Sequence, residues 1–469
     1  MLEKFVSTLN DIVWSPVLVV LLIAAGLYFT IRTRCVQVRR LGTMVRLLFG
    51  SRKPSGDAPE KEARGISSFQ AFCVALSGRV GTGNIVGVAT AIAMGGPGSV
   101  FWMWVIAFLG ASTAFVESTL AQIYKFPHSK SWSGGPASYI THGLHSKALG
   151  IVFAAFTILG YGLLLVTVQA NGAASAMHNS LEVSPLAGGL FLAALLALVI
   201  IGGLKSIAKV ASVVTPFMAL GYVVVSLVVL ALNWRAIPGL LGSIITNAFG
   251  INPLCGGILG STIAMGVKRG LFSNEAGQGG GAIVSASAEV THPAKQGLVQ
   301  AFSVYVDTLL VCTATALMIL SAGTFNVFNA SGEVLYAGAP EIRNNYVGYT
   351  QAAVDSVFSG FGGGFITVAL FFFVFTTVMA YYYYAEASIA YLFNLKPGAD
   401  PRKERAVLWV YRILLLSAVV FGAVKEANLI WMMGDIGVGL TTWINLIAIL
   451  ILCPQAIKAL RDLEKNGLS

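Results

Sequence analysis

Long apolar stretches of about 20 residues alternate with short polar segments along nearly the whole chain. A run of this length crosses a bilayer as an α-helix, whereas a transmembrane barrel would show alternating segments of about 10 residues. The pattern therefore predicts an all-α polytopic membrane protein with about eleven spans. We place these spans at residues 12–31, 66–94, 98–124, 150–178, 186–203, 206–232, 253–289, 296–322, 362–393, 405–424 and 428–453.

Composition agrees with a membrane protein and argues against an enzyme. Hydrophobic residues make up 56% of the chain and charged residues only 11%, against about 25% charged in soluble domains. The five cysteines are scattered singly, which favours buried apolar roles over disulfides or a metal site. No cluster of nucleophile and base appears, so we expect no catalytic residue. The net charge of +10 is explained by basic loops, and we expect no nucleic-acid partner.

The basic residues also predict an orientation. Most of the 30 lysines and arginines fall in loops that share one side of the membrane if the N-terminus lies outside. Because cytoplasmic loops are enriched in these residues, we expect an external N-terminus and a cytoplasmic C-terminus. Residues 36–49 alternate apolar and basic positions and predict an amphipathic helix on the inner membrane surface, followed by a loop over 51–64. The long outer loop at about 323–361 is a candidate lid.

Two glycine-rich segments interrupt the apolar spans, at residues 77–87 and 268–277. In both, an Arg is followed by an Asn five residues later and a Gly three residues after that: Arg79, Asn84 and Gly87, then Arg269, Asn274 and Gly277. Without the first span, ten spans remain and divide five and five near residue 235. Two halves with an odd number of spans have opposite orientations, so the repeat is predicted to be inverted.

This division predicts the organisation of the chain. Residues 1–65 form an extra N-terminal helix and a basic cytoplasmic linker, and residues 455–469 form a cytoplasmic tail. Residues 66–235 and 236–454 form the two inverted repeats, and the first and sixth core helices are discontinuous. A helix break inside hydrocarbon costs several kcal/mol for each unpaired backbone group unless it lines a cavity. Half-helix N-termini suit a carboxylate, and unwound carbonyls suit a cation or an ammonium. The alternative is that the glycines only permit close helix packing.

Beyond these patterns, the chain resembles the alanine-or-glycine:cation symporter family of bacteria and archaea. The resemblance rests on residues 78–98 (GRVGTGNIVGVATAIAMGGPG), 104–124 with Glu117, 134–136 with Tyr139, 270–281 (GLFSNEAGQGGG) and 286–293. It implies a leucine-transporter-like fold of 5+5 inverted repeats plus one extra N-terminal helix. It also implies sodium-coupled import of alanine or glycine across the bacterial cytoplasmic (inner) membrane, with no organic cofactor and no obligatory protein partner. The same family contains glutamine carriers, so glutamine stays an alternative substrate.

The first break supplies the predicted substrate site. We expect the backbone amides of Thr82, Gly83 and Asn84 to hold the substrate carboxylate. The resemblance places Gln169 at the substrate, and the alternative for this side chain is a hydrogen bond between helices. We expect the second break to begin at Phe272 and Ser273, where an aromatic ring could cap the ligand. The candidate substrate-binding residues are therefore Thr82, Gly83, Asn84, Gln169, Phe272, Ser273 and Asn274.

Sodium is expected between the first break and the eighth core span. The hydroxyls of Thr376 and Thr377, with the carbonyls of Val80 and Gly83, would offer hard oxygen ligands. The alternative is that these hydroxyls bond to carbonyls one turn back in their own helix.

Buried arginines predict two gates. Arg79 and Arg269 flank the site on opposite sides, and Glu117, Glu275 and Asp307 are the expected ion-pair partners. The alternative is a purely structural pair. A channel, the competing function, would need a selectivity filter, and no such sequence is visible.

Overall fold

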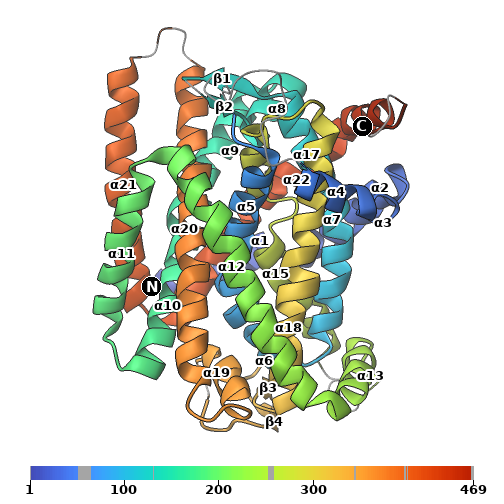
Figure 1. Ribbon diagram of the computed structural model, residues 1–469, viewed down its shortest axis with the longest axis vertical. Coiled ribbons are helices and arrows are strands. Elements are labelled where there is room, and N and C mark those ends of the chain that lie inside the picture. Colours follow the sequence, from blue (N-terminus) through green and yellow to red (C-terminus); the bar gives the residue numbers. More distant parts are fainter. Residues whose placement is uncertain are drawn as a thin grey trace.

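The computed structural model describes residues 2–50, 65–129, 131–251, 258–342, 345–395, 398 and 400–465. In this part of the chain, eight helices are long and apolar enough to cross a membrane, or nine if one bent pair counts as a span. Most of them run along the long axis of the molecule (Figure 1). The prediction of a polytopic all-α membrane protein is therefore confirmed, whereas the number of eleven spans stays a prediction.

The N-terminal region contains one helix more than expected. The span predicted at 12–31 corresponds to α2 (Pro16–Arg32), and a further helix, α1 (Leu2–Val13), precedes it. Proline is tolerated in the first turn of a helix because its missing N–H would have no partner there, and Pro16 accordingly begins α2. Helices are present in the expected segment, as α3 (Val36–Arg39) and α4 (Leu41–Gly50), and their place on the inner membrane surface stays a prediction. The predicted loop at 51–64 lies outside the described residues.

The first glycine-rich segment divides its span into two helical parts. Helix α5 (Ser68–Arg79) starts with a capping box in which Ser67 and Gln70 exchange hydrogen bonds, and it ends before the glycines. The chain then continues through η1 (Gly83–Gly87), a π-helical turn, into α6 (Val88–Gly95). The two parts are bent by 50°.

The remaining elements up to residue 248 are mostly helices of the bundle. They are α7 (Ser99–Ile123), β1 (Phe126–His128), β2 (Ser131–Ser133), α8 (Pro136–Gly143), α9 (Lys147–Leu159), η2 (Gly160–Leu165), α10 (Val166–Leu181), α11 (Pro185–Ile200), α12 (Gly203–Leu232), η3 (Trp234–Ala236) and α13 (Ile237–Ala248). The strands β1 and β2 pair in antiparallel fashion. Helix α13 is an addition that the hydropathy pattern did not predict.

The second half begins with another interrupted helix. Helix α15 (Leu259–Asn274) and α16 (Gly280–Ala286) are separated by residues 275–279. In this break Glu275, Gly277 and Gly279 have positive φ angles of 55°, 90° and 95°, a region that glycine adopts without steric cost. The first residues of the predicted span, 253–257, lie outside the described part of the chain.

The chain then completes the bundle with long helices. The elements are α17 (Pro293–Val304), η4 (Tyr305–Cys312), α18 (Thr313–Ala322), β3 (Asn326–Phe328), β4 (Val334–Ala337), α19 (Val347–Asp355), α20 (Gly362–Asn394), α21 (Pro401–Val424) and α22 (Ala427–Lys465). The candidate lid at 323–361 thus contains an antiparallel hairpin, β3–β4, and helix α19.

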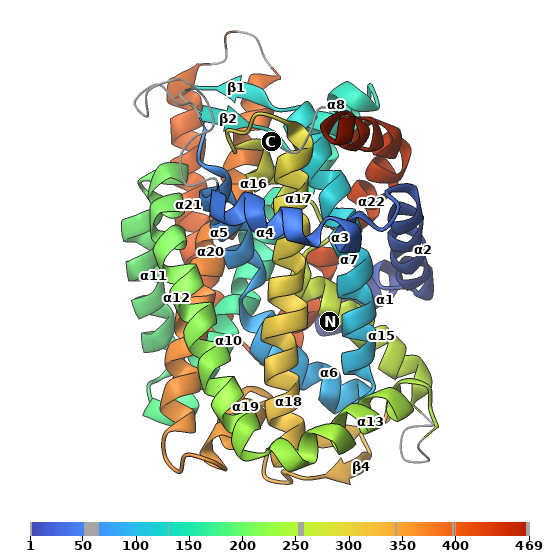
Figure 2. The same ribbon diagram turned by 45° about the vertical axis from the view of Figure 1, so that its right-hand side comes forward.

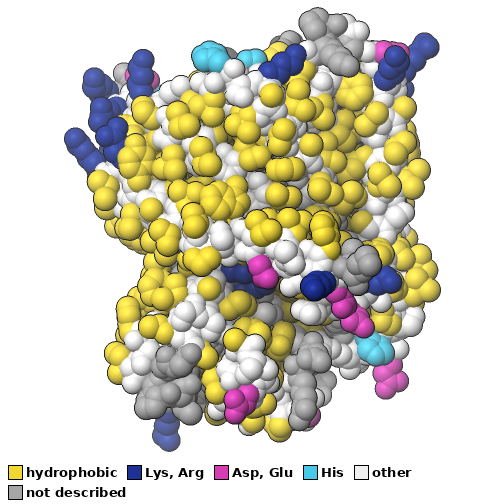
Figure 3. All heavy atoms as spheres, turned by 180° about the vertical axis from the view of Figure 1, so that it is seen from behind, with side chains coloured by type: hydrophobic (Ala, Val, Ile, Leu, Met, Phe, Trp, Pro, Cys, Tyr) yellow, Lys and Arg dark blue, Asp and Glu magenta, His cyan; other side chains and the backbone are white. Residues whose placement is uncertain are grey.

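The two ends of the bundle are distinguished by their small sheets. One end carries β1, β2 and α8, and the opposite end carries β3, β4, α13 and α19 (Figures 1 and 2). We call them the β1–β2 end and the β3–β4 end. Between them hydrophobic side chains cover a broad band of the surface (Figure 3), and large hydrophobic residues such as Leu198, Phe217 and Ile451 are exposed in the described chain. Such a surface suits contact with lipid, while the residues around both helix breaks lie buried inside the bundle.

Candidate functional site

The first break is stabilised by side chains that replace missing helical hydrogen bonds. The Gly81 N–H donates to Asn84 Oδ1 over 2.8 Å, and the Thr82 N–H donates to Gln169 Oε1 over 2.9 Å. These residues are buried, so each amide would be costly without a partner. The structure therefore places Gln169, on α10, directly against the first break.

Two glycines let the neighbouring helices approach this break. A Cβ atom at Gly81 would lie 2.6 Å from both Gln169 Oε1 and Thr377 Oγ1. At Gly83, a Cβ would lie 3.2 Å from the Phe272 ring and from the Ser273 backbone. The first break thus touches α10, α15 and α20 at once, and glycine is the residue that leaves room for all three.

Only one of the two predicted threonine hydroxyls faces the first break. The Thr377 hydroxyl lies 2.7 Å from the Ser77 carbonyl oxygen and 3.2 Å from that of Val80. Both hydroxyls also lie near the carbonyl one turn back in their own helix, Thr376 at 3.0 Å from that of Phe372 and Thr377 at 2.8 Å from that of Phe373, but no contact of Thr376 reaches the first break. Adjacent helical residues point about 100° apart, so one helix rarely directs both to the same place. The expected threonine pair is therefore reduced to Thr377.

The Gly83 carbonyl, expected as a sodium ligand, takes part in the backbone hydrogen bonds of η1. Its oxygen accepts the Val88 N–H within the π-helical turn. The carbonyls beside the Thr377 hydroxyl are those of Ser77 and Val80, and Ser77 was not among the residues that the sequence suggested for this place.

The second break starts later than expected. Helix α15 continues through Phe272, Ser273 and Asn274, so these residues form its last turn and not the break itself. The Asn274 side chain accepts the Ala276 N–H over 3.1 Å, and Gln278 donates to the Leu271 carbonyl over 2.6 Å. Local side chains thus satisfy backbone groups here as they do in the first break.

Arg269 forms a buried ion pair, but with a partner that we did not expect. Its two terminal nitrogens donate to the carboxylate oxygens of Asp435 on α22 over 3.0 and 2.8 Å. Lys268 reaches the same carboxylate at 2.8 Å. The expectation that Glu117, Glu275 or Asp307 would pair with Arg269 is wrong, because α22 brings Asp435 alongside α15.

An aromatic pair covers this ion pair. The Arg269 guanidinium lies 4.6 Å from the centre of the Trp431 ring and 5.7 Å from that of Phe272, and the two rings are 5.0 Å apart. These distances suit cation–π contacts. We did not predict a role for Trp431 from the sequence. The one feature that could have indicated it is its position one helical turn before Asp435 in an apolar span.

Arg79 is held by neutral groups. It donates to the Asn274 carbonyl over 2.6 Å, to Gln300 Oε1 over 3.1 Å and to the Ser303 hydroxyl. Among the described residues, no carboxylate lies within ion-pair distance of Arg79. The expected direct pair with Glu117, Glu275 or Asp307 is therefore also wrong, although each of these carboxylates is near enough for electrostatic attraction to Arg79.

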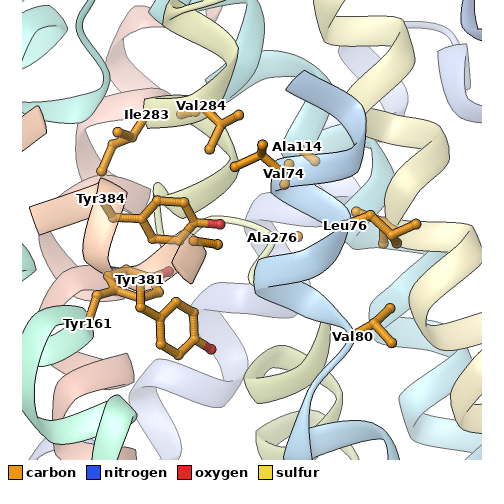
Figure 4. Packing of buried hydrophobic residues seen from close by; sticks show 14 of the residues in the cluster. Val74, Leu76, Val80, Ala114, Tyr161, Ala276, Ile283, Val284, Tyr381 and Tyr384 are labelled. Atoms are coloured by element: carbon orange, nitrogen blue, oxygen red, sulfur yellow. The ribbon is translucent and has the colours of Figure 1, made fainter. Parts of the chain in front are cut away.

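The expected acidic residues instead bind polar neighbours around the breaks. Glu117 accepts from Asn445 over 2.9 Å, and Glu275 accepts from the Tyr384 hydroxyl over 3.2 Å. Figure 4 shows the Tyr384 hydroxyl pointing from α20 toward the break near Ala276. Asp307 accepts from Asn84 and Ser273, two of the predicted substrate residues.

Comparison with known proteins shows the family to which the chain belongs. A family model described as the sodium:alanine symporter family matches residues 1–468. The chain is 48% identical over 403 residues to a sodium/proton-dependent alanine carrier protein of Bacillus sp. (strain PS3), covering 86% of this chain and 89% of that protein. It is 40% identical over 465 residues to a probable sodium/glutamine symporter, GlnT, of Bacillus subtilis (strain 168), covering 99% and 91%. It is 36% identical over 474 residues to the sodium/alanine symporter AgcS of Methanococcus maripaludis, covering 99% and 98%. The chain therefore belongs to the sodium:alanine symporter family.

Proposed function

We propose that this member of the sodium:alanine symporter family imports alanine, glycine or both together with sodium, by alternating access. The observation that carries the proposal is the meeting of two broken helices in the core, where Gly83 packs against Phe272 and Ser273. Gln169 and Thr377 approach the same break from two other helices. Paired broken helices at the middle of a bundle suit a small zwitterion and an alkali cation.

For the substrate, we assign the carboxylate to the amides of Thr82, Gly83 and Asn84. The Thr82 N–H is held by the Gln169 side chain, so substrate binding would exchange that hydrogen bond for one to the carboxylate. Gln169 is then released to contact the ammonium. From the other side, Phe272, Ser273 and Asn274 close the pocket. The tight packing around Gly81 and Gly83 favours side chains as small as those of alanine and glycine.

For sodium, we assign the Thr377 hydroxyl together with the carbonyls of Val80 and Ser77. All three oxygens are hard ligands of the kind that sodium prefers, and the Thr377 hydroxyl lies 2.7 Å from the Ser77 carbonyl oxygen and 3.2 Å from that of Val80. The site joins α20 to the end of α5, so a bound cation would hold these two elements together.

The proposal includes an orientation and an internal repeat. We assign eleven spans, the first of them outside a 5+5 inverted repeat over 66–235 and 236–454, with residues 1–65 and 455–469 flanking it. The N-terminus and the β3–β4 end lie outside, and the C-terminus and the β1–β2 end lie in the cytoplasm, in a bacterial inner membrane. In this orientation Arg269 belongs to the outer gate and Arg79 to the inner one. No obligatory protein partner is needed.

Uptake by purified protein in liposomes tests the proposal. An inward sodium gradient should drive accumulation of alanine above its external concentration, and replacing sodium with choline at fixed pH should abolish it. A panel of alanine, glycine and glutamine identifies the preferred substrate. Sodium-independent equilibration would indicate a channel-like pathway and refute symport, and accumulation of glutamine alone would refute the proposed substrate.

A further inference from the structure

Asp307 is a fully buried carboxylate that contacts both broken helices. It lies in η4, a π-helical segment between α17 and α18, which Figure 2 shows running along the bundle beside α5 and α6. Asn84 of the first break donates to Asp307 Oδ1 over 2.6 Å. Ser273, in the last turn before the second break, lies 3.0 Å from both carboxylate oxygens. π-Helical turns are uncommon and are frequent at functional sites.

The partners of this carboxylate are all neutral. Thr308 completes the set by donating to Oδ2 over 2.6 Å. The Asn84 side-chain amide cannot rotate by 180° without losing a hydrogen bond, because its oxygen accepts the Gly81 N–H. The Cys312 sulfur approaches Asn84 and Ser273 at 3.3 and 3.2 Å. Asp307 thus has hydrogen-bond donors for both oxygens, but in the described part of the chain no cationic side chain lies within ion-pair distance of it.

The charges around Asp307 compensate it only in part. The titratable or charged groups that act on it are Arg79 on α5, Glu275 after α15, Tyr381 on α20 and Cys312 on its own helix. The single guanidinium of Arg79 also attracts Glu117 and Glu275. One cation therefore faces three buried carboxylates. Burying an isolated charge in a low-dielectric interior costs several kcal/mol of desolvation free energy. A bound cation offsets this cost by neutralising the charge.

We infer that Asp307 is a second cation site, separate from the one at Thr377, and that it takes a proton or a sodium ion during each transport cycle. The inference rests on the proposed function and deepens it, because it adds one transported charge. A proton would form the neutral acid, whose O–H can donate to the Ser273 or Thr308 hydroxyl after that hydroxyl rotates. A sodium ion would be bound by the carboxylate and the same two hydroxyl oxygens.

The geometry connects this site to the substrate. Asn84 links Asp307 to the Gly81 amide in the first break, and Ser273 links it to the end of α15. Neutralising the carboxylate changes the hydrogen bonds of both residues, so cation binding at Asp307 would alter the positions of the amides assigned to the substrate. This arrangement makes cation binding and alanine binding mutually dependent.

The test is Asp307→Asn in purified protein reconstituted into liposomes, because asparagine imitates the neutralised carboxyl in size. The charge moved per alanine, the pH profile and the sodium dependence of uptake are measured for wild type and variant. The variant should move one charge fewer per alanine. At 100 mV this reduces the maximal accumulation by about 50-fold, from about 2.3 kcal/mol per charge.

The two cations give different signatures. If the site takes a proton, the pH dependence of uptake at saturating sodium should flatten in the variant. If it takes sodium, the pH profile should persist and the cooperativity toward sodium should fall. Unchanged charge, pH profile and sodium dependence together would overturn the inference and make Asp307 a structural acceptor. Absence of sodium-driven uptake in wild type would instead refute the proposed function itself.

A milder variant covers the possibility that Asp307→Asn does not insert. Thr308→Val removes one donor from the carboxylate at nearly constant volume, and it should shift the pH profile or the sodium dependence of alanine uptake. The matched control is Thr315→Val on the following helix, where the hydroxyl bonds to Tyr222 over 2.6 Å and not to Asp307. Equal behaviour of these two variants and wild type would also overturn the inference.

Discussion

Replacing Asp435 with Asn should favour the conformation that is open at the β3–β4 end. The Asp435 carboxylate accepts from both terminal nitrogens of Arg269 and pairs with Lys268. Its side chain is 3% exposed and that of Arg269 is 5% exposed, so solvent screens this pair weakly. Removing one partner of a buried pair costs about 3–5 kcal/mol, because the remaining charge is left uncompensated. If the pair forms only when this end is closed, a loss of about 3 kcal/mol raises the ratio of open to closed molecules by about 100-fold.

The assay is the labelling rate of a cysteine at Thr90, a partly buried residue on α6, in a background without the five native cysteines. A membrane-impermeant maleimide applied from the β3–β4 side should react faster in Asp435→Asn. The control is Glu464→Gln, which also removes an acid paired with two cations, Arg39 and Arg40. Those side chains are 23–38% exposed, and exposed pairs contribute at most about 1 kcal/mol, so the control should label like wild type. Equal rates in all three proteins would refute the gate.

Three further substitutions test the substrate and sodium assignments. Thr377→Ala should raise the sodium concentration needed for half-maximal uptake by about 10-fold, because the ion loses a ligand worth roughly 1–2 kcal/mol. Thr376→Ala should change this concentration little. Equal effects of the two substitutions would contradict the geometry. Gln169→Leu should abolish alanine binding, because it removes the acceptor of the Thr82 N–H and adds no polar group. Calorimetry on folded protein measures the binding. Wild-type affinity would show that the pocket is misplaced. Gly81→Ala should abolish both alanine binding and sodium dependence, because its Cβ would meet Gln169 and Thr377 at 2.6 Å. If either property is retained, the break is more adaptable than its packing indicates.

Hydropathy predicted most of the long helices because their apolar runs are long and nearly continuous, whereas it missed α1 and α13. The glycine-rich segments were equally readable, and the chain is interrupted after Arg79 and after Asn274. The boundaries of the second break could not be predicted, since Glu275 adopts a left-handed conformation that is not restricted to glycine. Pro16 could have indicated that α1 and α2 are separate helices, but the apolar run across it obscured this signal.

Side-chain partners were much harder to predict than the breaks. Asp435 follows Arg269 by 166 residues, and nothing local in either span indicates that α22 packs beside α15. The choice between Thr376 and Thr377 depends on the rotation of α20 about its axis, which a helix buried on most sides does not reveal through its hydrophobic pattern. The position of the Ser77 carbonyl beside Thr377 was unpredictable for a related reason, because any residue type can present a backbone carbonyl.

The two arginines of the predicted repeat illustrate how equivalent sequence positions acquire different roles. Arg269 has a charged partner, Asp435, and lies under the aromatic rings of Trp431 and Phe272. Arg79 has three neutral partners and binds the backbone carbonyl of Asn274, at the edge of the second break. An ion pair of the first kind can separate and re-form when its end of the bundle opens. Arg79 instead joins the two breaks to each other, so its release would require the second break to rearrange. A repeated sequence pattern therefore does not imply equivalent contacts: if the two arginines act as the proposed gates, opening one end would break a pair of side chains, whereas opening the other would change the backbone contacts of the second break.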